Sequence, residues 1–186
     1  MQFEFSDKAA VVTGAGSGIG RASAIEFARH GARVAIADID LHGAEETAQT
    51  ISELGGTCLV IQTDVSDAES VRGMIDVIVS EFGGLDYAHN NAGTEGQVDS
   101  SRGTLETSEE EWDRLLAINL KGVWLCMRAE IPHMLERGGG AIVNSGSISS
   151  LVGSTAGFVA YSASKSGILG LTRSAALEFA SRGIRV

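Results

Sequence analysis

The stretch AAVVTGAGSGIGRASAIEFARHGARVAIAD, residues 9–38, decides the fold class. It begins with an apolar run at 9–14 and continues at 18–30 with apolar side chains at helical spacing. It closes with a second apolar run at 33–38. A strand, a helix and a second strand in this order predict a βαβ unit with parallel strands.

The same alternation extends over the rest of the chain. It predicts an α/β fold, a Rossmann-type doubly wound parallel sheet with helices on both faces. We expect residues 1–186 to form a single domain that ends at the start of a sixth strand, which leaves the sheet incomplete on its C-terminal side. Further strands are expected at 58–64, 85–90, 141–147 and from 183 onward, and further helices at 40–54, 67–82, 108–136 and 159–182.

The composition argues against several classes of protein. The 186 residues carry a formal net charge of −10 at pH 7, which disfavours nucleic acid or an anionic membrane as a partner. Cys58 and Cys126 form no CxxC pair, so we expect free thiols in a cytoplasmic protein without a metal. The chain does not begin like a signal peptide, and no window reaches about 18 consecutive apolar residues, so no membrane span is predicted.

The segment TGAGSGIG, residues 13–20, lies between the first predicted strand and the first predicted helix. Glycines permit a tight turn, and a helix N-terminus offers backbone N–H groups and a partial positive charge to a diphosphate. The strict G-x-G-x-x-G pattern is not kept, because Ile19 occupies its last position, and no Lys-Ser/Thr pair follows as in a P-loop. A glycine-rich turn without a ligand is the alternative, which the flanking strand and helix disfavour.

Asp38 ends the second predicted strand. A carboxylate there can accept hydrogen bonds from both hydroxyls of an adenosine ribose and would repel a 2′-phosphate, so the sequence predicts NAD rather than NADP. Neither Ile39 nor Asp40 offers a guanidinium to such a phosphate. The alternative role for Asp38 is the N-cap of the helix at 40–54, which Asp40 suits at least as well.

Asp64 and Val65 follow the third predicted strand and are candidates to border an adenine. Ligands of open parallel sheets bind beyond the carboxyl ends of the strands, where both residues fall. As an alternative, Asp64 could cap the helix at 67–82, although Ser66 or Asp67 could take that role instead.

The segment AYSASKSG, residues 160–167, places Tyr161 and Lys165 one helical turn apart. Residues at i and i+4 are neighbours on one helix face, and a nearby ammonium favours the phenolate form of a tyrosine, which can accept a proton. The alternative is two helix-surface residues that have this spacing by chance.

Seven segments, in order along the chain, resemble the short-chain dehydrogenase/reductase family. The resemblance extends from residue 7 to the end, and the complete set is far more specific than any one motif. The segments are TGAGSGIG (13–20), Asp38, TDV (63–65), NNAG (90–93), AINLKG (117–122), AIVNSGSIS (141–149) and YSASK (161–165).

The resemblance implies a role for each matched residue. Tyr161 would be the general acid/base, Lys165 would assist it and bind the nicotinamide ribose, Ser147 would offer a hydroxyl to the substrate oxygen, and Asn119 would hold a water. The implied catalytic residues are Asn119, Ser147, Tyr161 and Lys165. The implied cofactor-binding residues are Gly14, Ser17, Gly18, Ile19, Gly20, Asp38, Asp64, Val65, Asn91, Ala92, Gly93, Tyr161 and Lys165.

Two positions depart from the family pattern. The segment from Ser147 to Tyr161 is one residue longer than in the family, and Ser145 is the nearest rival to Ser147 for the catalytic hydroxyl. His89 stands at the end of the fourth predicted strand, where the family commonly has an aliphatic residue. We expect it to be a hydrogen-bonded histidine packed beside the cofactor loop rather than a catalytic one.

The resemblance implies an NAD(H)-dependent oxidoreductase that interconverts a small secondary alcohol and its ketone by hydride transfer, with Tyr161 as general acid/base. Family members continue for about 60–70 residues more, so we expect the parent chain to be longer. A non-catalytic NAD-binding module left by C-terminal truncation is the alternative. The helices at 108–136 and 159–182 resemble those that pair across subunits in the family, which implies a homo-dimer or homo-tetramer.

Overall fold

The computed structural model describes residues 5–96, 103–153 and 158–186. In these ranges the strands form one sheet in the order β3-β2-β1-β4-β5-β6, and all neighbouring strands are parallel. The order reverses between β1 and β4, where open sheets of this type bind ligands. The strands are β1 (Ala9–Thr13), β2 (Arg33–Asp38), β3 (Thr57–Gln62), β4 (Tyr87–Asn90), β5 (Gly140–Asn144) and β6 (Ile184–Arg185).

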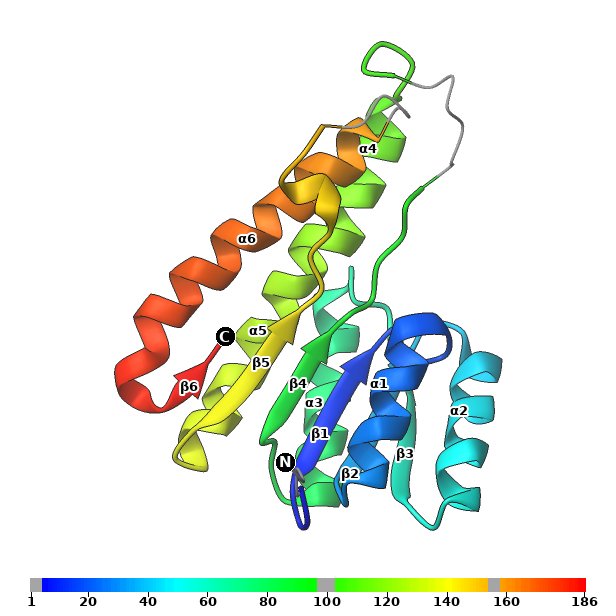
Figure 1. The fold of residues 1–186 in the computed structure, drawn as a ribbon, viewed down its shortest axis with the longest axis vertical. Helices are drawn as coiled ribbons and strands as arrows, with labels where there is room; N and C mark the ends of the chain where they lie inside the picture. The colour runs from blue at the N-terminus through cyan, green and yellow to red at the C-terminus, as the bar shows by residue number, and fades with distance from the viewer. Residues whose placement is uncertain (1–4, 97–102, 154–157) are drawn as a thin grey trace.

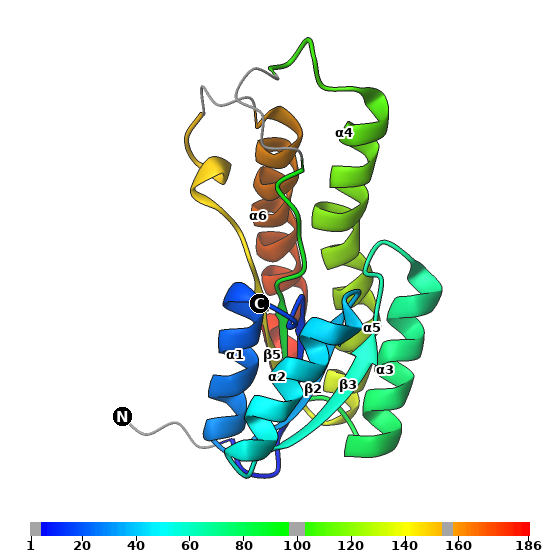
Figure 2. The same cartoon turned by 90° about the vertical axis from the view of Figure 1, so that its right-hand side faces the viewer.

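Helices cover both faces of the sheet, which confirms the predicted fold class. α1 and α2 lie on one face, and α3, α5 and α6 lie on the other (Figures 1 and 2). None of the helices in the described ranges combines the length and the apolarity needed to cross a bilayer. The helices are α1 (Gly18–Arg29), α2 (Leu41–Glu53), α3 (Ala68–Phe82), α4 (Glu109–Leu116), α5 (Gly122–Glu136) and α6 (Val159–Phe179).

Strand β1 shows why its sequence is a continuous apolar run. Ala9 and Val11 pack into the core shared with α3, α5 and α6, whereas Ala10 and Val12 pack into the core shared with α1 and α2. Successive side chains of a strand point to opposite faces of the sheet. A strand with both faces covered must therefore be apolar at every position, as expected for the centre of a doubly wound sheet.

The helix predicted at 108–136 is continuous in extent but not in its hydrogen bonding. Between α4 and α5 lies a π-helical turn, Ala117–Lys121, where the N–H of Gly122 bonds the carbonyl of Ala117, five residues back. Single π turns inside α-helices occur frequently at functional sites. This turn contains Asn119, whose side chain is fully buried.

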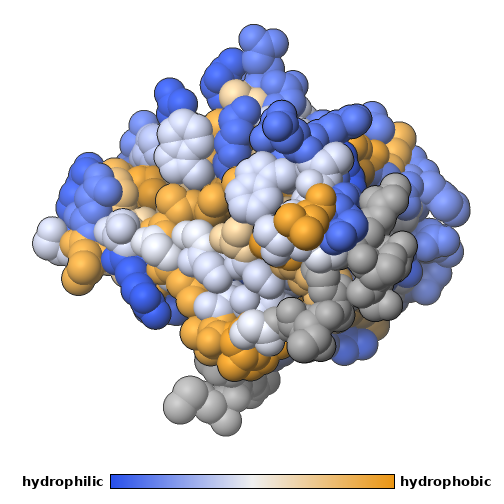
Figure 3. Space-filling view, turned by 90° about the horizontal axis from the view of Figure 1, so that it is seen from above, coloured by the Kyte–Doolittle hydropathy of each residue, from blue (hydrophilic) through white to orange (hydrophobic). Residues whose placement is uncertain are grey.

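The carboxyl ends of the strands lie at one edge of the sheet, the upper edge in Figure 1. There α4 and the first turns of α6 extend beyond the sheet, and Figure 3 looks onto this end, where hydrophobic patches interrupt a polar surface. The strand predicted at 141–147 ends earlier, at Asn144, so Ser145 and the residues after it belong to this edge.

The described chain closes on a short sixth strand. α6 is followed by a 3-10 turn, Ala180–Arg182, and by Gly183 with a φ of 79°, a conformation that favours glycine. β6 then pairs in parallel with Gly140 and Ala141 of β5. The start of a sixth strand, predicted from the sequence, is confirmed.

A buried polar cluster joins four elements beneath the carboxyl edge. Glu130 of α5 is fully buried and accepts a hydrogen bond from Asn90 Nδ2 at 3.1 Å. Asn90 also donates to Asn144 Oδ1 at 3.0 Å, and Asn144 Nδ2 donates to Thr172 Oγ1 of α6 at 3.0 Å. Burial raises the pKa of Glu130 to about 8, so its carboxyl group is protonated at neutral pH.

Candidate active site

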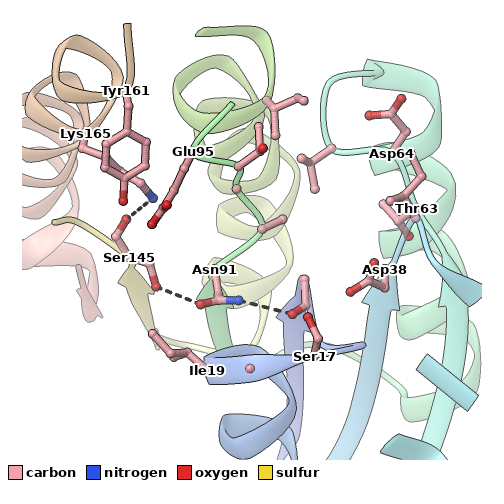
Figure 4. A pocket seen from close by; sticks show the side chains of 18 of the residues that line it. Ser17, Ile19, Asp38, Thr63, Asp64, Asn91, Glu95, Ser145, Tyr161 and Lys165 are labelled. Carbon is pink, nitrogen blue, oxygen red and sulfur yellow. Dashed lines mark hydrogen bonds between the residues drawn. The ribbon is translucent and has the colours of Figure 1, made fainter. Parts of the chain in front are cut away.

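A cavity of about 450 Å³ opens at the carboxyl edge of the sheet (Figure 4). Its walls come from the glycine turn after β1, from the ends of β2, β3, β4 and β5, and from α6. Elements far apart in the sequence therefore meet at one site. The predicted residues that line it are Gly14, Ser17, Gly18, Ile19, Asp38, Asp64, Val65, Asn91, Ala92, Gly93, Tyr161 and Lys165.

The glycine turn leaves one wall of the cavity without side chains. Gly18 begins α1 with a φ of 51°, and a Cβ built on it would meet no protein atom within 4 Å. Gly14, with a φ of 65°, lies so close to Ala92 that an added Cβ would be 2.8 Å from the Ala92 Cα. Gly20 does not line the cavity; it packs against the Gly14 carbonyl, where a Cβ has no room. The N–H groups at the start of α1 are thus open to an anion.

Asp38 closes the glycine turn from the end of β2. Its Oδ2 accepts a hydrogen bond from the Gly16 N–H at 2.7 Å, and its Oδ1 accepts one from the Asp40 N–H at 2.9 Å. The N-cap of α2 is Asp40, so the alternative role weighed for Asp38 is wrong. Each carboxylate oxygen has a second acceptor site, so Asp38 can still receive hydroxyl groups of a ligand.

Asp64 and Val65 also line the cavity, after β3. Asp64 Oδ1 accepts hydrogen bonds from the Ser66 N–H at 2.9 Å and from the Ser66 hydroxyl at 2.7 Å. The N-cap of α3 is Asp67, which accepts from two backbone N–H groups of the first turn. The alternative of Asp64 as the helix cap is therefore wrong as well.

Asn91 ties the end of β4 to the glycine turn. Its Nδ2 donates to the carbonyl oxygens of Thr13 and Gly14, at 3.2 Å and 3.3 Å. The hydroxyl oxygen of Thr13 in turn accepts from the backbone N–H groups of Asn91 and Ala92, both at 3.1 Å. These bonds fix the floor of the cavity between β1 and β4.

Tyr161 and Lys165 project into the cavity from α6, side by side (Figure 4). The Lys165 Nζ lies 5.8 Å from the centre of the Tyr161 ring, within the range of a cation–π contact, and donates to the Ser145 carbonyl at 2.8 Å. Lys165 is buried, and desolvation lowers the pKa of its ammonium. The structure thus brings together the phenol and the amine that the sequence placed one turn apart.

Asn119 does not line the cavity but supports its wall. Its Nδ2 donates to the Thr94 carbonyl at 2.8 Å and to the Ser164 hydroxyl at 3.2 Å, and its Oδ1 accepts from the Thr94 N–H at 2.8 Å. A Cβ built on Gly93 would lie 3.1 Å from Asn119 Oδ1 and 3.5 Å from Lys165 Nζ. The missing side chain at Gly93 therefore lets the π turn approach the part of the cavity that Lys165 lines.

Ser147 lies just outside the lining. It is half-buried and caps the 3-10 turn Ile148–Ser150, where its Oγ accepts from the Ser149 N–H at 3.1 Å. Ser145 and Gly146 line the cavity in its place. The structure therefore brings the rival, Ser145, to the wall and keeps Ser147 next to it.

Some lining residues were not predicted as site residues from the sequence. The most distinctive is Glu95, whose side chain extends into the cavity on the side of Tyr161 and Lys165 (Figure 4). It follows the NNAG motif closely, and this position beyond a strand end is the signal that could have found it. The others are Ile39, Thr63, Thr94, Ile118, Ser145 and Gly146.

The site combines an anion-binding turn, a carboxylate at the end of β2 and a phenol beside an ammonium. Such a site can hold a ligand that carries a diphosphate and a ribose, and it can transfer a proton at the Tyr161 hydroxyl. In the part of the chain that the structure describes, no three His, Cys, Asp or Glu side chains are placed to hold a metal ion. Proton transfer beside a bound dinucleotide is the chemistry that these residues support.

Sequence comparisons identify the family and the relatives that this chain resembles. The family model "short chain dehydrogenase" matches residues 8–186. Cyclohexanol dehydrogenase of Acinetobacter sp. is 41% identical over 186 residues, which cover 100% of this chain and 72% of that protein. The 3-oxoacyl-acyl-carrier-protein reductase FabG of Staphylococcus aureus is 42% identical over 183 residues, which cover 96% of this chain and 71% of that protein.

Solved structures share the fold. The structure of NAD⁺-bound xylitol dehydrogenase matches with a TM-score of 0.93 at 33% identity, over 98% of this chain and 68% of that one. The structure of 7α-hydroxysteroid dehydrogenase complexed with NADH and 7-oxo glycochenodeoxycholic acid matches with a TM-score of 0.92 at 28% identity, over 100% of this chain and 70% of that one.

Proposed function

The chain belongs to the short chain dehydrogenase family, and we propose that it is an oxidoreductase that uses NAD(H) to interconvert a small secondary alcohol and its ketone. The observation that carries this proposal is the placement of Tyr161 and Lys165 in the same cavity as the glycine turn and Asp38. The cavity thus joins a proton-transfer pair to a dinucleotide site.

The residues present fit a nicotinamide dinucleotide. The open N-terminus of α1, with no side chain at Gly18, suits the diphosphate, and Asp38 suits the adenosine ribose. Asp64 and Val65 would border the adenine, and Asn91, Ala92 and Gly93 would lie along the cofactor. Lys165 would hydrogen-bond the nicotinamide ribose.

Asp38 supports NAD over NADP, because its carboxylate would repel a 2′-phosphate. The Arg21 guanidinium, at the glycine turn, is engaged by the Gly16 carbonyl and by Glu46, to which it forms an ion pair of 2.8 Å. Two similar solved structures are described as bound to NAD⁺ and to NADH, respectively.

Tyr161 would transfer the proton of the reaction. In alcohol oxidation its phenolate oxygen accepts the proton of the substrate hydroxyl, and in ketone reduction its hydroxyl returns a proton to the carbonyl oxygen. When bound, the cofactor would supply the hydride chemistry at the substrate carbon. Lys165 would place a positive charge beside the Tyr161 ring, where its Nζ lies 5.8 Å from the ring centre.

Two further residues would assist this step. The Ser147 hydroxyl would donate to the substrate oxygen and stabilise the charge that develops there. Asn119 would hold the π turn and the loop at Thr94 in place around a proton-relay water, because its amide already bonds that loop.

An exposed apolar groove supports a homo-dimer or homo-tetramer. It has a volume of about 690 Å³ and lies between the α4–α5 segment and α6. Trp124 in this groove is 42% exposed, and a contiguous apolar groove is typical of a surface that meets a partner. Sedimentation should give two or four times the chain mass of 19.3 kDa, and a monomer would contradict this part of the proposal.

The function is tested by turnover. The purified chain is mixed with NAD and a panel of secondary alcohols that begins with cyclohexanol, and the absorbance of the reduced cofactor is followed. The proposal predicts NADH formation with at least one alcohol and a marked preference for NAD over NADP. NADH binding without turnover on any alcohol or ketone of the panel would indicate a non-catalytic binding module instead.

A further inference from the structure

His89 lies at the centre of a chain of hydrogen bonds that the proposed mechanism does not use. It lies in β4, next to the last residue of the strand, Asn90, with only 9% of its surface exposed. Its Nδ1 lies 2.9 Å from the Ser23 hydroxyl of α1, and its Nε2 lies 2.9 Å from the Ser145 hydroxyl. Both ring nitrogens therefore have partners, as predicted from the sequence for a hydrogen-bonded histidine packed beside the cofactor loop.

The donor and acceptor of each of these hydrogen bonds follow from the backbone carbonyls at one end of the series. The carbonyl oxygens of Thr13 and Gly14 can only accept, so the Asn91 atom that faces them is Nδ2 and its Oδ1 faces Ser145. The Ser145 hydroxyl donates its single hydrogen to this Oδ1 at 3.3 Å.

The remaining bonds are then determined. Because the Ser145 hydroxyl has no hydrogen left, the bond between Ser145 and His89 must be donated by the His89 Nε2–H. Burial lowers the pKa of His89, which favours the neutral ring. Its Nδ1 is then an acceptor, and it receives the hydroxyl hydrogen of Ser23.

The hydrogen bonds around His89 lead to two parts of the proposed cofactor site, the glycine turn and Lys165. At one end, Asn91 packs beneath the glycine turn, since a Cβ on Gly20 would lie 2.7 Å from Asn91 Nδ2. At the other, the backbone carbonyl of Ser145 accepts the Lys165 ammonium at 2.8 Å. A single residue, Ser145, therefore links His89 to both the turn and the lysine.

We propose that His89 is a positioning residue for the cofactor site, which acts as the Nε2–H donor that holds Ser145 and, through it, the Asn91 amide and the Lys165 ammonium. This inference rests on the proposed function, because the site that His89 organises is the NAD(H) site. Without the donor, the Ser145 hydroxyl is free to turn away from Asn91, and the amide under the glycine turn loses the hydrogen bond to its Oδ1 while Nδ2 keeps the bonds to the turn.

Three substitutions at His89 separate the donor from the bulk of the ring. In His89→Gln the amide nitrogen can occupy the place of Nε2 and donate to Ser145, whereas in His89→Asn the shorter side chain reaches only the place of Nδ1. His89→Leu keeps the volume and removes both polar atoms. The matched control is His133→Asn on α5, where His133 Nδ1 lies 3.5 Å from the Glu136 carboxylate and the residue does not line the cavity.

NADH binding is measured by fluorescence titration, together with thermal unfolding and the KM for NAD. We expect the dissociation constant to rise about tenfold in His89→Asn and His89→Leu, to stay within about threefold of wild type in His89→Gln, and to be unchanged in His133→Asn. Equal binding by all the variants, or a loss in His89→Gln as large as in His89→Leu, overturns the inference. A wild-type chain that does not bind NADH contradicts the proposed function instead.

A second measurement needs no cofactor. The ¹⁵N spectrum of the histidine rings in the free protein distinguishes Nε2–H, Nδ1–H and doubly protonated rings, and the signal missing in His89→Gln identifies His89. The inference predicts a neutral ring protonated at Nε2 at neutral pH. A ring protonated at Nδ1, or at both nitrogens, overturns it.

Discussion

The ammonium of Lys165 donates a hydrogen bond of 2.8 Å to the backbone carbonyl of Ser145. This bond joins helix α6 to the chain that leaves β5, and it holds the positive charge beside the ring of Tyr161. Because the acceptor is a backbone atom, the position of the lysine depends directly on the course of the chain after β5.

Replacement of Lys165 by methionine should remove activity without unfolding the protein. The ammonium is buried and its pKa is lowered by desolvation, so its charge is not a source of stability. We expect the unfolding free energy to stay within about 1 kcal/mol of wild type, while kcat falls at least about a hundredfold. Urea unfolding and steady-state kinetics measure the two quantities. A destabilisation of several kcal/mol would contradict this account.

Asp38→Asn should shift the cofactor preference. The variant removes the charge that would repel a 2′-phosphate, so we expect the ratio of kcat/KM for NAD to that for NADP to fall at least about tenfold. Asp40→Asn is the matched control, because Asp40 lies two residues away and is exposed. An unchanged ratio in Asp38→Asn, or an equal shift in the control, would show that Asp38 does not select the cofactor.

Ser147→Ala should lower kcat by about tenfold to a thousandfold, because it removes a donor to the reacting oxygen. The serine also caps a 3-10 turn, so Ser147→Thr is needed as a rescue that keeps the hydroxyl. We expect Ser147→Thr to recover much of kcat and Ser149→Ala to resemble wild type. If Ser145→Ala abolishes kcat while Ser147→Ala does not, the catalytic hydroxyl belongs to Ser145.

Glu130 should make the protein less stable as the pH rises. Its pKa is about 8 in the folded state against 4.5 for the exposed group, so between these values the folded state retains a proton that the unfolded state has released. Unfolding therefore releases a proton in this pH range. Stability then falls by up to about 1.4 kcal/mol per pH unit as the pH rises, until the pH passes about 8.

Glu130→Gln removes this titration, so from about pH 6 to about pH 8 its unfolding free energy should gain about 2 kcal/mol relative to wild type. Urea unfolding at the two pH values gives the difference, in which other titrating groups cancel. Glu178→Gln, an exposed glutamate on α6, should run parallel to wild type. If the unfolding free energies of Glu130→Gln and wild type change equally between the two pH values, the raised pKa of Glu130 is contradicted.

The strands and helices could be predicted because both faces of the sheet are covered. Apolar runs such as 33–38 and helical spacings such as 18–30 carry that information locally. The π turn at Ala117–Lys121 could not be predicted, because it depends on bonds between Asn119 and the loop at Thr94 that form only in the folded protein.

Part of the candidate site could likewise be predicted from the sequence and part could not. The glycine turn, Asp38 and the Tyr161–Lys165 pair follow from the chemistry that a dinucleotide and a proton transfer require. The contribution of Ser145 does not, since it acts partly through a backbone carbonyl, and the bonds of His89 join residues 66 and 56 positions away in the sequence. Local patterns contain no signal for such contacts.

Tyr161 is proposed to transfer the proton at a site that holds NAD(H) independently of it. Tyr161→Phe removes only the hydroxyl oxygen, so the test pairs its kcat with its dissociation constant for NADH. We predict that kcat falls by about a hundredfold to ten-thousandfold, with NADH binding within about threefold of wild type. A Tyr161→Phe variant that turns over like wild type on an alcohol that the wild-type enzyme oxidises would contradict the account.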